Sequence, residues 1–206
     1  LSLHDALPIF FGLNALTGGS IAIDGRSVTI RNPREAIANG IALVPEDRHH
    51  EGLFLDRNLL QNSAASVLER ISSKFGVVDV KQERRVGEDT LVNLQVNTRD
   101  LALLAQSLSG GNQQKVLLGK WVATAPKLLI LDSPTVGVDV GSKSQIYEII
   151  RQLSSRGIAI LVISDEEEEL LAVCNRIAIF VQGAVTAELS GEQLKPGFSA
   201  IYRNAD

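Results

Sequence analysis

Two short segments of this 206-residue chain carry side chains suited to chemistry on a phosphate group. The first reads Leu-Ser-Gly-Gly-Asn-Gln-Gln-Lys and begins at Leu108. Ser109 can cap a helix whose first turn starts at Gly110 and Gly111, where backbone N–H groups can approach an anion beside the positive end of the helix dipole. Asn112 and Gln113 add neutral polar groups to this turn. The segment therefore predicts a helix start that faces a phosphate.

The second segment is an apolar strand that ends in a carboxylate. Leu128–Leu131 is a continuous apolar run after Pro126, as expected of a parallel strand that is buried on both faces. Asp132 follows at its carboxyl end, where open α/β sheets bind ligands. An acid at this place most often holds Mg²⁺ bound to nucleotide phosphates, so Asp132 is the candidate metal ligand. Taken singly, a Ser-Gly-Gly loop and an acid at a strand end also fit a plain turn and a helix cap.

The order of the two segments is more specific than either alone. The octapeptide, a helical stretch, a buried strand and Val-Gly-Val-Asp follow one another, and this order resembles the ATP-binding-cassette (ABC) ATPases. The resemblance implies that Leu108–Gln114 is the signature motif, Leu128–Asp132 the Walker B strand and Val136–Asp139 the D-loop. In that family the signature acts on ATP held by a second cassette. The implied nucleotide-binding residues are Leu108, Ser109, Gly110, Gly111, Asn112, Gln113 and Asp139.

Composition restricts the possible classes of function. The chain has 45% apolar and 21% charged residues, a net charge of −4 and a pI near 5.5, which suit one packed domain and give no support to a nucleic-acid-binding surface. The single Cys174 excludes an internal disulfide. His49 and His50 stand without a second cluster of ligands, so no structural metal site is expected. The longest apolar runs, such as Ile158–Ile163, are far too short to span a bilayer.

Turn residues and periodicity predict an α/β fold. With the resemblance, they indicate a P-loop NTPase-like ABC ATPase domain that has a mostly parallel core sheet, antiparallel edge strands and a helical subdomain. The segment Gly19–Arg26 is expected to form a short strand that runs into an Asp-Gly turn. The other expected strands are Val28–Ile30, Ile41–Val44, Leu128–Leu131, a buried parallel Ile158–Ile163, and the closing pair Arg176–Val181 and Ala184–Leu189. The expected helices outside the subdomain are Pro33–Asn39, a core-facing helix carrying Ile146, Ile149, Ile150 and Leu153, and a short helix with an acidic first turn at Glu166–Glu169.

A helical subdomain is expected over about residues 58–105. Apolar residues recur with helical spacing from Leu59 to Ile71, and charged helical turns follow around Lys81–Leu94. The charges in these turns have mixed sign, which is typical of a solvated helix face rather than of a binding patch. Such a subdomain would present the signature motif at its far side.

Three positions depart from what the resemblance implies for a competent ATP site. Glu46 looks like the Q-loop residue, usually a Gln that touches the metal and the attacking water, although a Glu-Asp-Arg loop is equally compatible with a solvated turn. Ser133 stands where the catalytic Glu is expected, and Ser164 where the family has its switch His. A Ser cannot act as a carboxylate base at neutral pH, and loss of a general base typically costs about 10²–10⁴-fold in rate. This cassette's own nucleotide site is therefore predicted to hydrolyse ATP weakly.

The start of the chain does not look like the start of a cassette. Leu1–Ile9 resembles the conceptual translation of a common sequencing adapter, so we exclude it from the expected domain, residues 10–206. No Gly-x-x-x-x-Gly-Lys-Ser/Thr motif occurs in the sequence, and Phe10–Leu13 looks like the end of the helix that follows such a loop. We therefore expect the first strand and the Walker A loop to be missing from this chain. The resulting gap in the sheet predicts poor solubility of the chain alone.

Three local matches narrow the resemblance further: Leu-Ser-Gly-Gly-Asn-Gln-Gln-Lys, Val-Gly-Val-Asp-Val-Gly, and Pro-Arg-Glu-Ala-Ile followed by Val-Pro-Glu-Asp-Arg. They look like the C-terminal cassette of bacterial monosaccharide importers of the ribose, galactose and xylose type. In that family two fused cassettes dimerise head to tail beneath a transmembrane permease, which a periplasmic sugar-binding protein supplies. The resemblance implies ATP and Mg²⁺ as cofactors, no nucleic acid as partner, and a peripheral place on the cytoplasmic face of the inner membrane.

Other functions remain open at this point. Importers of nucleosides or of a signalling sugar derivative share Asn-Gln-Gln-Lys, and the sequence does not separate them from sugar importers. The serines at positions 133 and 164 also suit a non-catalytic scaffold derived from an ATPase. A soluble ABC protein acting on ribosomes or DNA is disfavoured, because it would call for a basic surface or an insertion arm.

Overall fold

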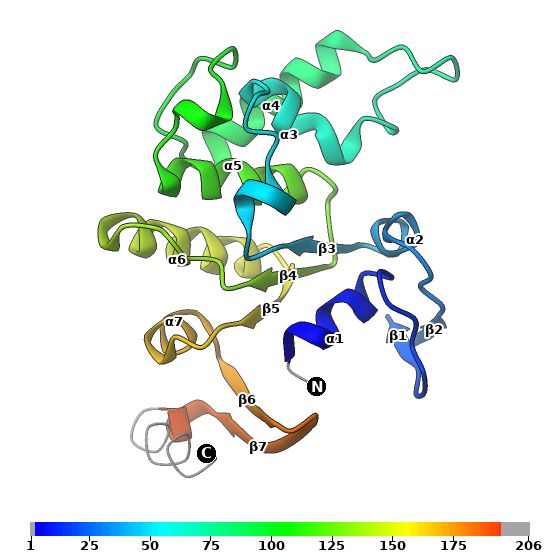
Figure 1. Cartoon of the computed structure of the whole chain (residues 1–206), viewed down its shortest axis with the longest axis vertical. Coiled ribbons are helices and arrows are strands. Elements are labelled where there is room, and N and C mark those ends of the chain that lie inside the picture. Colours follow the sequence, from blue (N-terminus) through cyan, green and yellow to red (C-terminus); the bar gives the residue numbers. More distant parts are fainter. Residues whose placement is uncertain (1–2, 195–206) are drawn as a thin grey trace.

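A three-stranded parallel sheet forms the centre of the molecule in the computed structural model, which describes residues 3–194 (Figure 1). Its strands lie in the order β3 (Ile41–Val44), β4 (Leu128–Asp132) and β5 (Ala159–Ile163). Two long helices, α5 (Gly110–Val122) and α6 (Val140–Ser155), connect successive strands and lie on the same side of the sheet. This arrangement follows from the parallel pairing, since each parallel connection must cross back over the sheet.

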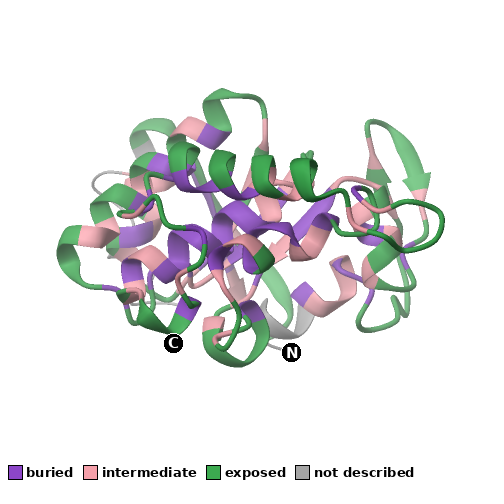
Figure 2. Cartoon of the chain, turned by 90° about the horizontal axis from the view of Figure 1, so that it is seen from above, coloured by how far each residue is buried: buried purple, intermediate pink, exposed green. Residues whose placement is uncertain are grey.

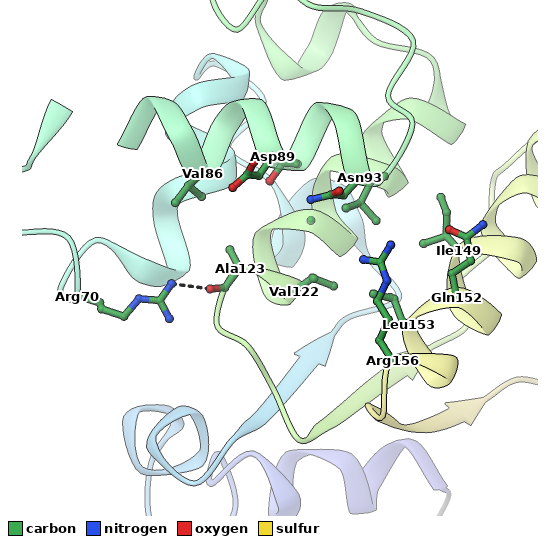
Figure 3. A pocket seen from close by; sticks show the side chains of 13 residues that line it. Arg70, Val86, Asp89, Asn93, Val122, Ala123, Ile149, Gln152, Leu153 and Arg156 are labelled. Carbon is green, nitrogen blue, oxygen red and sulfur yellow. Dashed lines mark hydrogen bonds between the residues drawn. The ribbon is translucent and has the colours of Figure 1, made fainter. Parts of the chain in front are cut away.

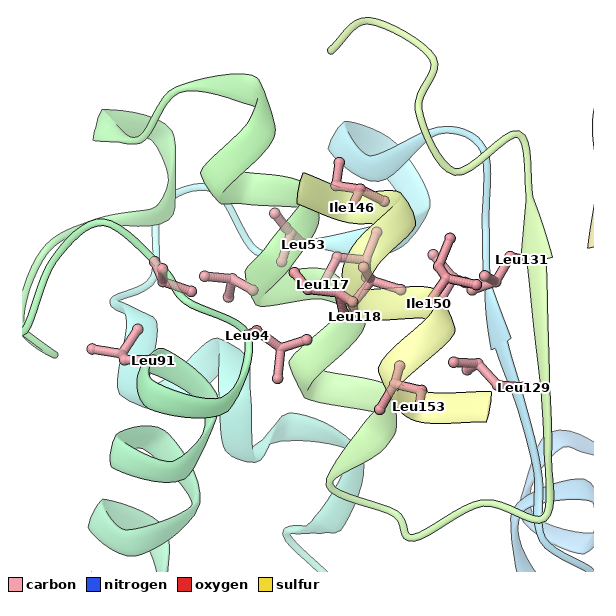
Figure 4. Close-up of a cluster of buried hydrophobic side chains, with 14 of the residues drawn as sticks. Leu53, Leu91, Leu94, Leu117, Leu118, Leu129, Leu131, Ile146, Ile150 and Leu153 are labelled. Carbon is pink, nitrogen blue, oxygen red and sulfur yellow. The ribbon is translucent and has the colours of Figure 1, made fainter. Parts of the chain in front are cut away.

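The central strand β4 is buried on both faces, as its continuous apolar sequence predicts. Leu129 and Leu131 point to one face and pack with residues of α5 and α6, among them Leu117 and Ile146 (Figure 4). Ile130 points to the other face and belongs to a second apolar cluster. Because successive side chains of a strand point to opposite faces, β4 contributes residues to both apolar clusters.

The second face of the sheet is covered by elements from the start of the chain. These are α1 (Leu3–Phe10), the antiparallel hairpin of β1 (Ile21–Ile23) and β2 (Arg26–Val28), and α2 (Pro33–Ala38). Leu7 is only 3% exposed, and Phe11 meets Trp121 edge to face with ring centroids 5.4 Å apart. The adapter origin inferred for Leu1–Ile9 stays a prediction, and its first two residues lie outside the described part of the chain.

The predicted helical subdomain is present, but its first helix is shorter than the apolar spacing suggests. It contains α3 (Leu59–Ala64), a 3₁₀ turn at Ala65–Val67, α4 (Val80–Asn93) and a 3₁₀ turn at Ala105–Ser107. A helix reaching Ile71 is wrong, because Ile71 accepts a hydrogen bond from Asp79 N and the segment between them folds back with a bridge from Ser72 to Val78. The charged face of α4 is solvated as predicted, with exposed pairs such as Arg84 with Glu88.

The expectation that Ile158–Ile163 is fully buried is also wrong. Strand β5 pairs with β4, and within residues 3–194 no strand pairs with its other edge. Ala159 and Leu161 are exposed, Leu161 at 38%, whereas Ile163 is buried. The apolar run thus predicted the strand and its parallel direction. It could not show that, among the described residues, one edge of β5 has no paired strand.

The end of the described chain agrees with the expected closing pair. Helix α7 (Glu167–Val173) leads into the antiparallel strands β6 (Arg176–Val181) and β7 (Ala184–Ser190), followed by a 3₁₀ turn at Gly191–Leu194. Cys174 is half-buried beside this pair, and burial raises the pKa of its thiol to about 11. None of the helices in the described range is both long and apolar enough to cross a membrane.

Helix α5 lies at the centre of the packing. Buried residues run through the middle of the molecule between exposed surfaces (Figure 2), and most of α5 is among them. The buried Lys120 near its C-terminal end donates to Gly52 O at 2.8 Å and lies over the rings of Phe54 and Trp121. Burial lowers the pKa of this amine. A buried charge needs partners of this kind, so Lys120 fixes that end of α5 to the loop after β3.

Candidate nucleotide-facing site

The signature motif forms the N-terminus of α5, but Ser109 does not cap it with its side chain. Ser109 occupies the N-cap position, and its backbone carbonyl accepts from Gln113 N at 2.9 Å. Its hydroxyl instead accepts from Asn112 Nδ2 at 3.0 Å, which corrects the predicted cap. The N–H groups of Gly110, Gly111 and Asn112 precede the first intrahelical bond, so no carbonyl within the helix receives them. The helix start therefore keeps the donors that an anion requires.

Close packing adds a second reason for the two glycines. A Cβ atom on Gly110 would lie 3.0 Å from Arg48 Nη2 and 3.0 Å from Gly137 O. One on Gly111 would lie 2.4 Å from Ser142 Oγ. The glycines thus let the start of α5 press against the D-loop and the first turn of α6, as well as leaving their N–H groups accessible.

Arg48 joins the loop after β3 to both neighbouring segments. Its Nη1 donates to Val136 O at 2.7 Å, its Nη2 to Gly137 O at 3.0 Å, and its Nε to Gln113 Oε1 at 3.3 Å. Sequence reasoning placed Arg48 in the Q-loop segment and in the Val-Pro-Glu-Asp-Arg match, but gave its side chain no role. No local signal reveals its role, since the two carbonyls lie 88 and 89 residues further along the chain.

Gln113 faces the protein interior. It is 6% exposed, its Nε2 donates to Ala105 O at 3.1 Å, and its Oε1 lies 3.0 Å from His49 Nε2 as well as near Arg48. We call the group formed by Arg48, Gln113, Val136, Gly137 and the start of α5 the signature junction. The predicted contact of Gln113 with nucleotide stays a prediction, and its side chain lies inside this junction.

Asp139 ends the D-loop and begins α6. Its carboxylate accepts from Ser142 N at 3.0 Å and from Ser142 Oγ at 2.8 Å, so it is the N-cap of the helix. The hydrogen bonds from Ser142 lower the pKa of this carboxyl group. Because Ser142 also meets Gly111, the cap of α6 helps to position the signature motif.

The sequence pattern of the ABC transporter family matches residues 6–136. The chain belongs to the ABC transporter family. It is similar to the ribose import ATP-binding protein RbsA of Chelativorans sp. (strain BNC1), with 45% identity over 179 residues, which are 87% of this chain and 35% of that protein. It is 39% identical to RbsA 2 of Escherichia coli O157:H7 over 90% of this chain and 37% of that protein. The chain thus spans little more than a third of the length of these relatives.

Solved cassettes show the same fold. A nucleotide-free ATP-binding cassette from an ABC transporter superposes with a TM-score of 0.80 at 20% identity, over 98% of this chain and 78% of that one. The dimeric bacterial ABC transporter cassette MJ0796 gives a TM-score of 0.74 at 19% identity, over 91% of this chain and 79% of that one. The predicted α/β cassette fold is therefore confirmed.

The ABC fold brings the remaining candidate residues to the carboxyl edge of the sheet. Glu46 follows β3 and is exposed, half-buried Asp132 ends β4, and half-buried Ser164 follows β5. Ser133 comes directly after Asp132, with its N–H donating to Ile163 O at 2.8 Å and its backbone in the left-handed region at φ +44°. The Ser164 hydroxyl accepts from Glu166 N at 3.0 Å and so starts the turn into α7.

One buried carboxylate at this edge was not anticipated. The short helix α7 and its acidic first turn are as predicted, with Glu166 at the N-cap position. Glu169, however, is 1% exposed and accepts from Thr135 Oγ1 at 2.7 Å, so it ties α7 to the loop that follows Ser133. Glu166 pairs with Lys143 of α6 and raises the pKa of that amine.

The donor set at the sheet edge suits a metal that arrives with nucleotide. The described residues contain no group of three or more His, Cys, Asp or Glu side chains placed to hold a metal ion. Mg²⁺ on a nucleotide usually takes one or two carboxylates from the protein and its other ligands from phosphates and water. The single carboxylate of Asp132 at the end of β4 fits that mode.

A cavity of about 240 Å³ lies elsewhere, between α4, α5 and α6 (Figure 3). Its lining includes Thr90, Gly119, Val122, Ile149 and Arg156. Gly119 and Val122 belong to the C-terminal part of α5, whereas the signature motif forms the N-terminus of the same helix. This cavity is therefore separate from the candidate nucleotide-facing site.

Proposed function

We propose that this chain is one ATP-binding cassette of a bacterial importer for simple sugars of the ribose type, and that its signature motif acts on ATP held by a second cassette. The observation that carries the proposal is the start of α5, whose backbone donors are held in place by Arg48 and Ser142. The similarity to ribose import ATP-binding proteins supports the substrate class.

The signature contributes fixed hydrogen-bond donors. Ser109 is exposed, and the N–H groups of Gly110 and Gly111 belong to a helix start packed against α6. In a head-to-tail pair of cassettes these groups would donate to the γ-phosphate of the second cassette's ATP as its charge redistributes. Asn112 and Gln113 support that surface through hydrogen bonds, Leu108 packs against the apolar core beside it, and Asp139 caps the helix after the adjoining D-loop.

The cassette's own site would bind nucleotide more than hydrolyse it. Asp132 would hold Mg²⁺, which neutralises charge on the phosphates when bound. Neither Ser133 nor Ser164 can take a proton as a carboxylate or imidazole does, so neither provides a general base. Glu46 at the Q-loop position lies on the same edge but is exposed to solvent. The two ATP sites of the intact importer would therefore be unequal.

The proposed partners follow from the substrate class. The second cassette is fused to this one or binds it, a transmembrane permease contacts the pair, and a periplasmic sugar-binding protein delivers the sugar to the permease. The cassettes would lie on the cytoplasmic face of the inner membrane. The dimeric cassette among the solved relatives supports the pairing, and the net charge of −4 gives no support to nucleic acid as a partner.

The test is ATP hydrolysis by the full-length protein with its permease in lipid vesicles. We expect hydrolysis that rises when a binding protein loaded with ribose, galactose or xylose is added. If ATP hydrolysis rose only with nucleosides or with a signalling sugar derivative, that compound would replace simple sugars as the substrate class. No hydrolysis in the assembled complex would favour a non-catalytic scaffold, for which the serines at positions 133 and 164 are the specific observation.

A further inference from the structure

We propose that Arg48 is a positioning residue for the ATP site formed with the second cassette. In this proposal the loop after β3 sets the relative position of the D-loop and the signature motif through the Arg48 side chain. The inference rests on the proposed function, since it concerns the surface that would face the second cassette's ATP. It assigns a role to the last residue of the Val-Pro-Glu-Asp-Arg segment, to which sequence reasoning assigned no function of its own.

The first argument is the hydrogen-bond pattern of Arg48. Its two terminal nitrogens donate to the carbonyls of consecutive D-loop residues, Val136 at 2.7 Å and Gly137 at 3.0 Å. Its third donor, Nε, reaches the buried amide of Gln113 in α5 at 3.3 Å. A planar guanidinium offers several donors at fixed angles, whereas the ammonium of lysine is a compact charge on a flexible stem. Only arginine can therefore hold these acceptors in one geometry.

The second argument is the close approach of two glycines to the guanidinium. A Cβ on Gly110 would lie 3.0 Å from Arg48 Nη2, and one on Gly137 would lie 3.2 Å from the same atom. Gly137 also has φ +66°, a backbone conformation that L-residues with side chains rarely adopt. The side chain of Arg48 thus lies against both the D-loop and the first residue of the signature helix, beside the place where these two segments meet.

The third argument is the anchoring of the Arg48 backbone. It begins a π-helical turn at Arg48–Gly52, which Asp47 caps by accepting from His49 N and His50 N, each at 3.0 Å. The turn packs against α5 near the end of β3 (Figure 1), where a Cβ on Gly52 would lie 2.8 Å from Leu117. A movement of this loop would therefore move the D-loop and the signature helix together.

The closing experiment measures kcat and KM for ATP in the full-length protein with its permease. We expect Arg48→Met to lower kcat by about 10- to 100-fold, because a misplacement of about 1 Å in a reacting geometry can cost this much. KM for ATP should change by less than about twofold, since the second cassette supplies most ATP contacts. Arg48→Lys keeps the charge and should recover only part of kcat. Full recovery by Lys would overturn the role of the guanidinium.

A matched control and a double mutant separate positioning from folding. Arg85→Met replaces an exposed arginine of α4 that makes only a weak surface pair, and it should leave kcat and Tm unchanged. Gln113→Leu removes one acceptor, and its effect on kcat should not add to that of Arg48→Met. Additive effects with an equal fall in Tm would reduce Arg48 to a folding role and overturn the inference.

The proposed function and the inference fail in different ways. An inactive wild-type complex rejects the proposed function whatever Arg48 does. An active complex in which Arg48→Met behaves like Arg85→Met leaves the function standing and overturns the inference. If Arg48→Met does not fold, the comparison of Arg48→Lys with wild type still decides, because lysine retains the long apolar stem and the charge.

Discussion

The signature junction and the carboxyl edge of the sheet are both built from polar residues that follow apolar segments, yet the side chains of their candidate residues make different kinds of contact. At the junction, Arg48 bonds to carbonyls 88 and 89 residues away and Gly111 presses against Ser142. At the edge, the Ser164 hydroxyl bonds within its own turn, and Ser133 donates through its backbone N–H to Ile163 O. The difference agrees with the proposal that the signature junction acts on a partner's ATP, whereas the cassette's own site binds nucleotide more than it hydrolyses it.

The largest expected effect is at Ser109, and it tests the comparison directly. Replacing exposed Ser109 with Arg in the full-length protein should lower ATP turnover by at least about 10²-fold, because a bulky side chain would block preorganised donors of that worth. Ser133→Glu should change turnover by less than about twofold, since the site it restores is the weaker one. Steady-state ATP hydrolysis with the permease measures both. A severalfold rise in turnover on Ser133→Glu would contradict the unequal sites.

The next effect concerns packing at the junction. Gly111→Ala should destabilise the protein by about 1–3 kcal/mol, because its Cβ would lie 2.4 Å from Ser142 Oγ and overpacking of this kind forces neighbours to move. Urea unfolding midpoints measure the change. Gly18→Ala is the control, since a Cβ there would have no heavy atom within 4 Å apart from those of Gly18 and its two chain neighbours. Ser142→Gly should recover part of the loss in the double variant, and no loss at Gly111 would show that the junction is loosely packed.

At the carboxyl edge of the sheet, we expect a substitution to stabilise the protein rather than destabilise it. Ser133 has φ +44°, a left-handed conformation that costs an L-residue about 1–2 kcal/mol. Ser133→Gly should therefore stabilise the protein by about 0.5–1 kcal/mol, after allowance for the larger entropy of glycine in the unfolded chain. Ser133→Ala keeps the strain and serves as the control in the same unfolding assay. A loss of stability in the glycine variant would mean that the serine side chain makes a contact worth keeping.

The smallest effect is a pH dependence beside the junction, at the N-cap of α6. Hydrogen bonds from Ser142 hold the pKa of Asp139 below its ordinary value of 3.8 in the folded protein. Its stabilising contribution is therefore present above the unfolded pKa and is lost as the pH falls through the folded pKa. The difference in urea midpoint between wild type and Asp139→Asn should be largest near pH 6–7 and shrink below about pH 4. Ser142→Ala should reduce this difference in urea midpoint. A difference that does not change with pH would exclude the charge of Asp139 as its cause.

Much of the fold could be predicted because its signals are local. The stripe from Ile146 to Leu153 and the apolar run of β4 follow the periodicities of a helix and a buried strand, and the structure confirms both. The same holds for the short helix that begins at Pro33, where a proline at the first position and a glycine beyond the end mark the boundaries. These signals depend on a few neighbouring residues only.

The errors and omissions depend on contacts between distant segments. The exposure of Leu161 depends on which strands flank β5, and the end of α3 at Ala64 depends on the segment that folds back at Ile71. The presence of a serine at position 109 predicted where the helix starts. It did not predict that the Ser109 hydroxyl would bond to the side chain of Asn112. Arg48 was missed for the same reason, since only the folded chain brings its acceptors together.

A small tilt of helix α5 about its C-terminal end would move its N-terminal end by a larger distance. Its 13 residues make a rod about 20 Å long, since an α-helix rises 1.5 Å per residue. One end carries the glycines of the signature motif, and the other is fixed by Lys120 and Trp121 against Gly52 and Phe11. A tilt of about 5° about the fixed end would displace the glycines by about 1.7 Å, enough to break a hydrogen bond. In the proposed function, the position of the donors that would face a phosphate thus depends partly on the packing at the opposite end of the helix.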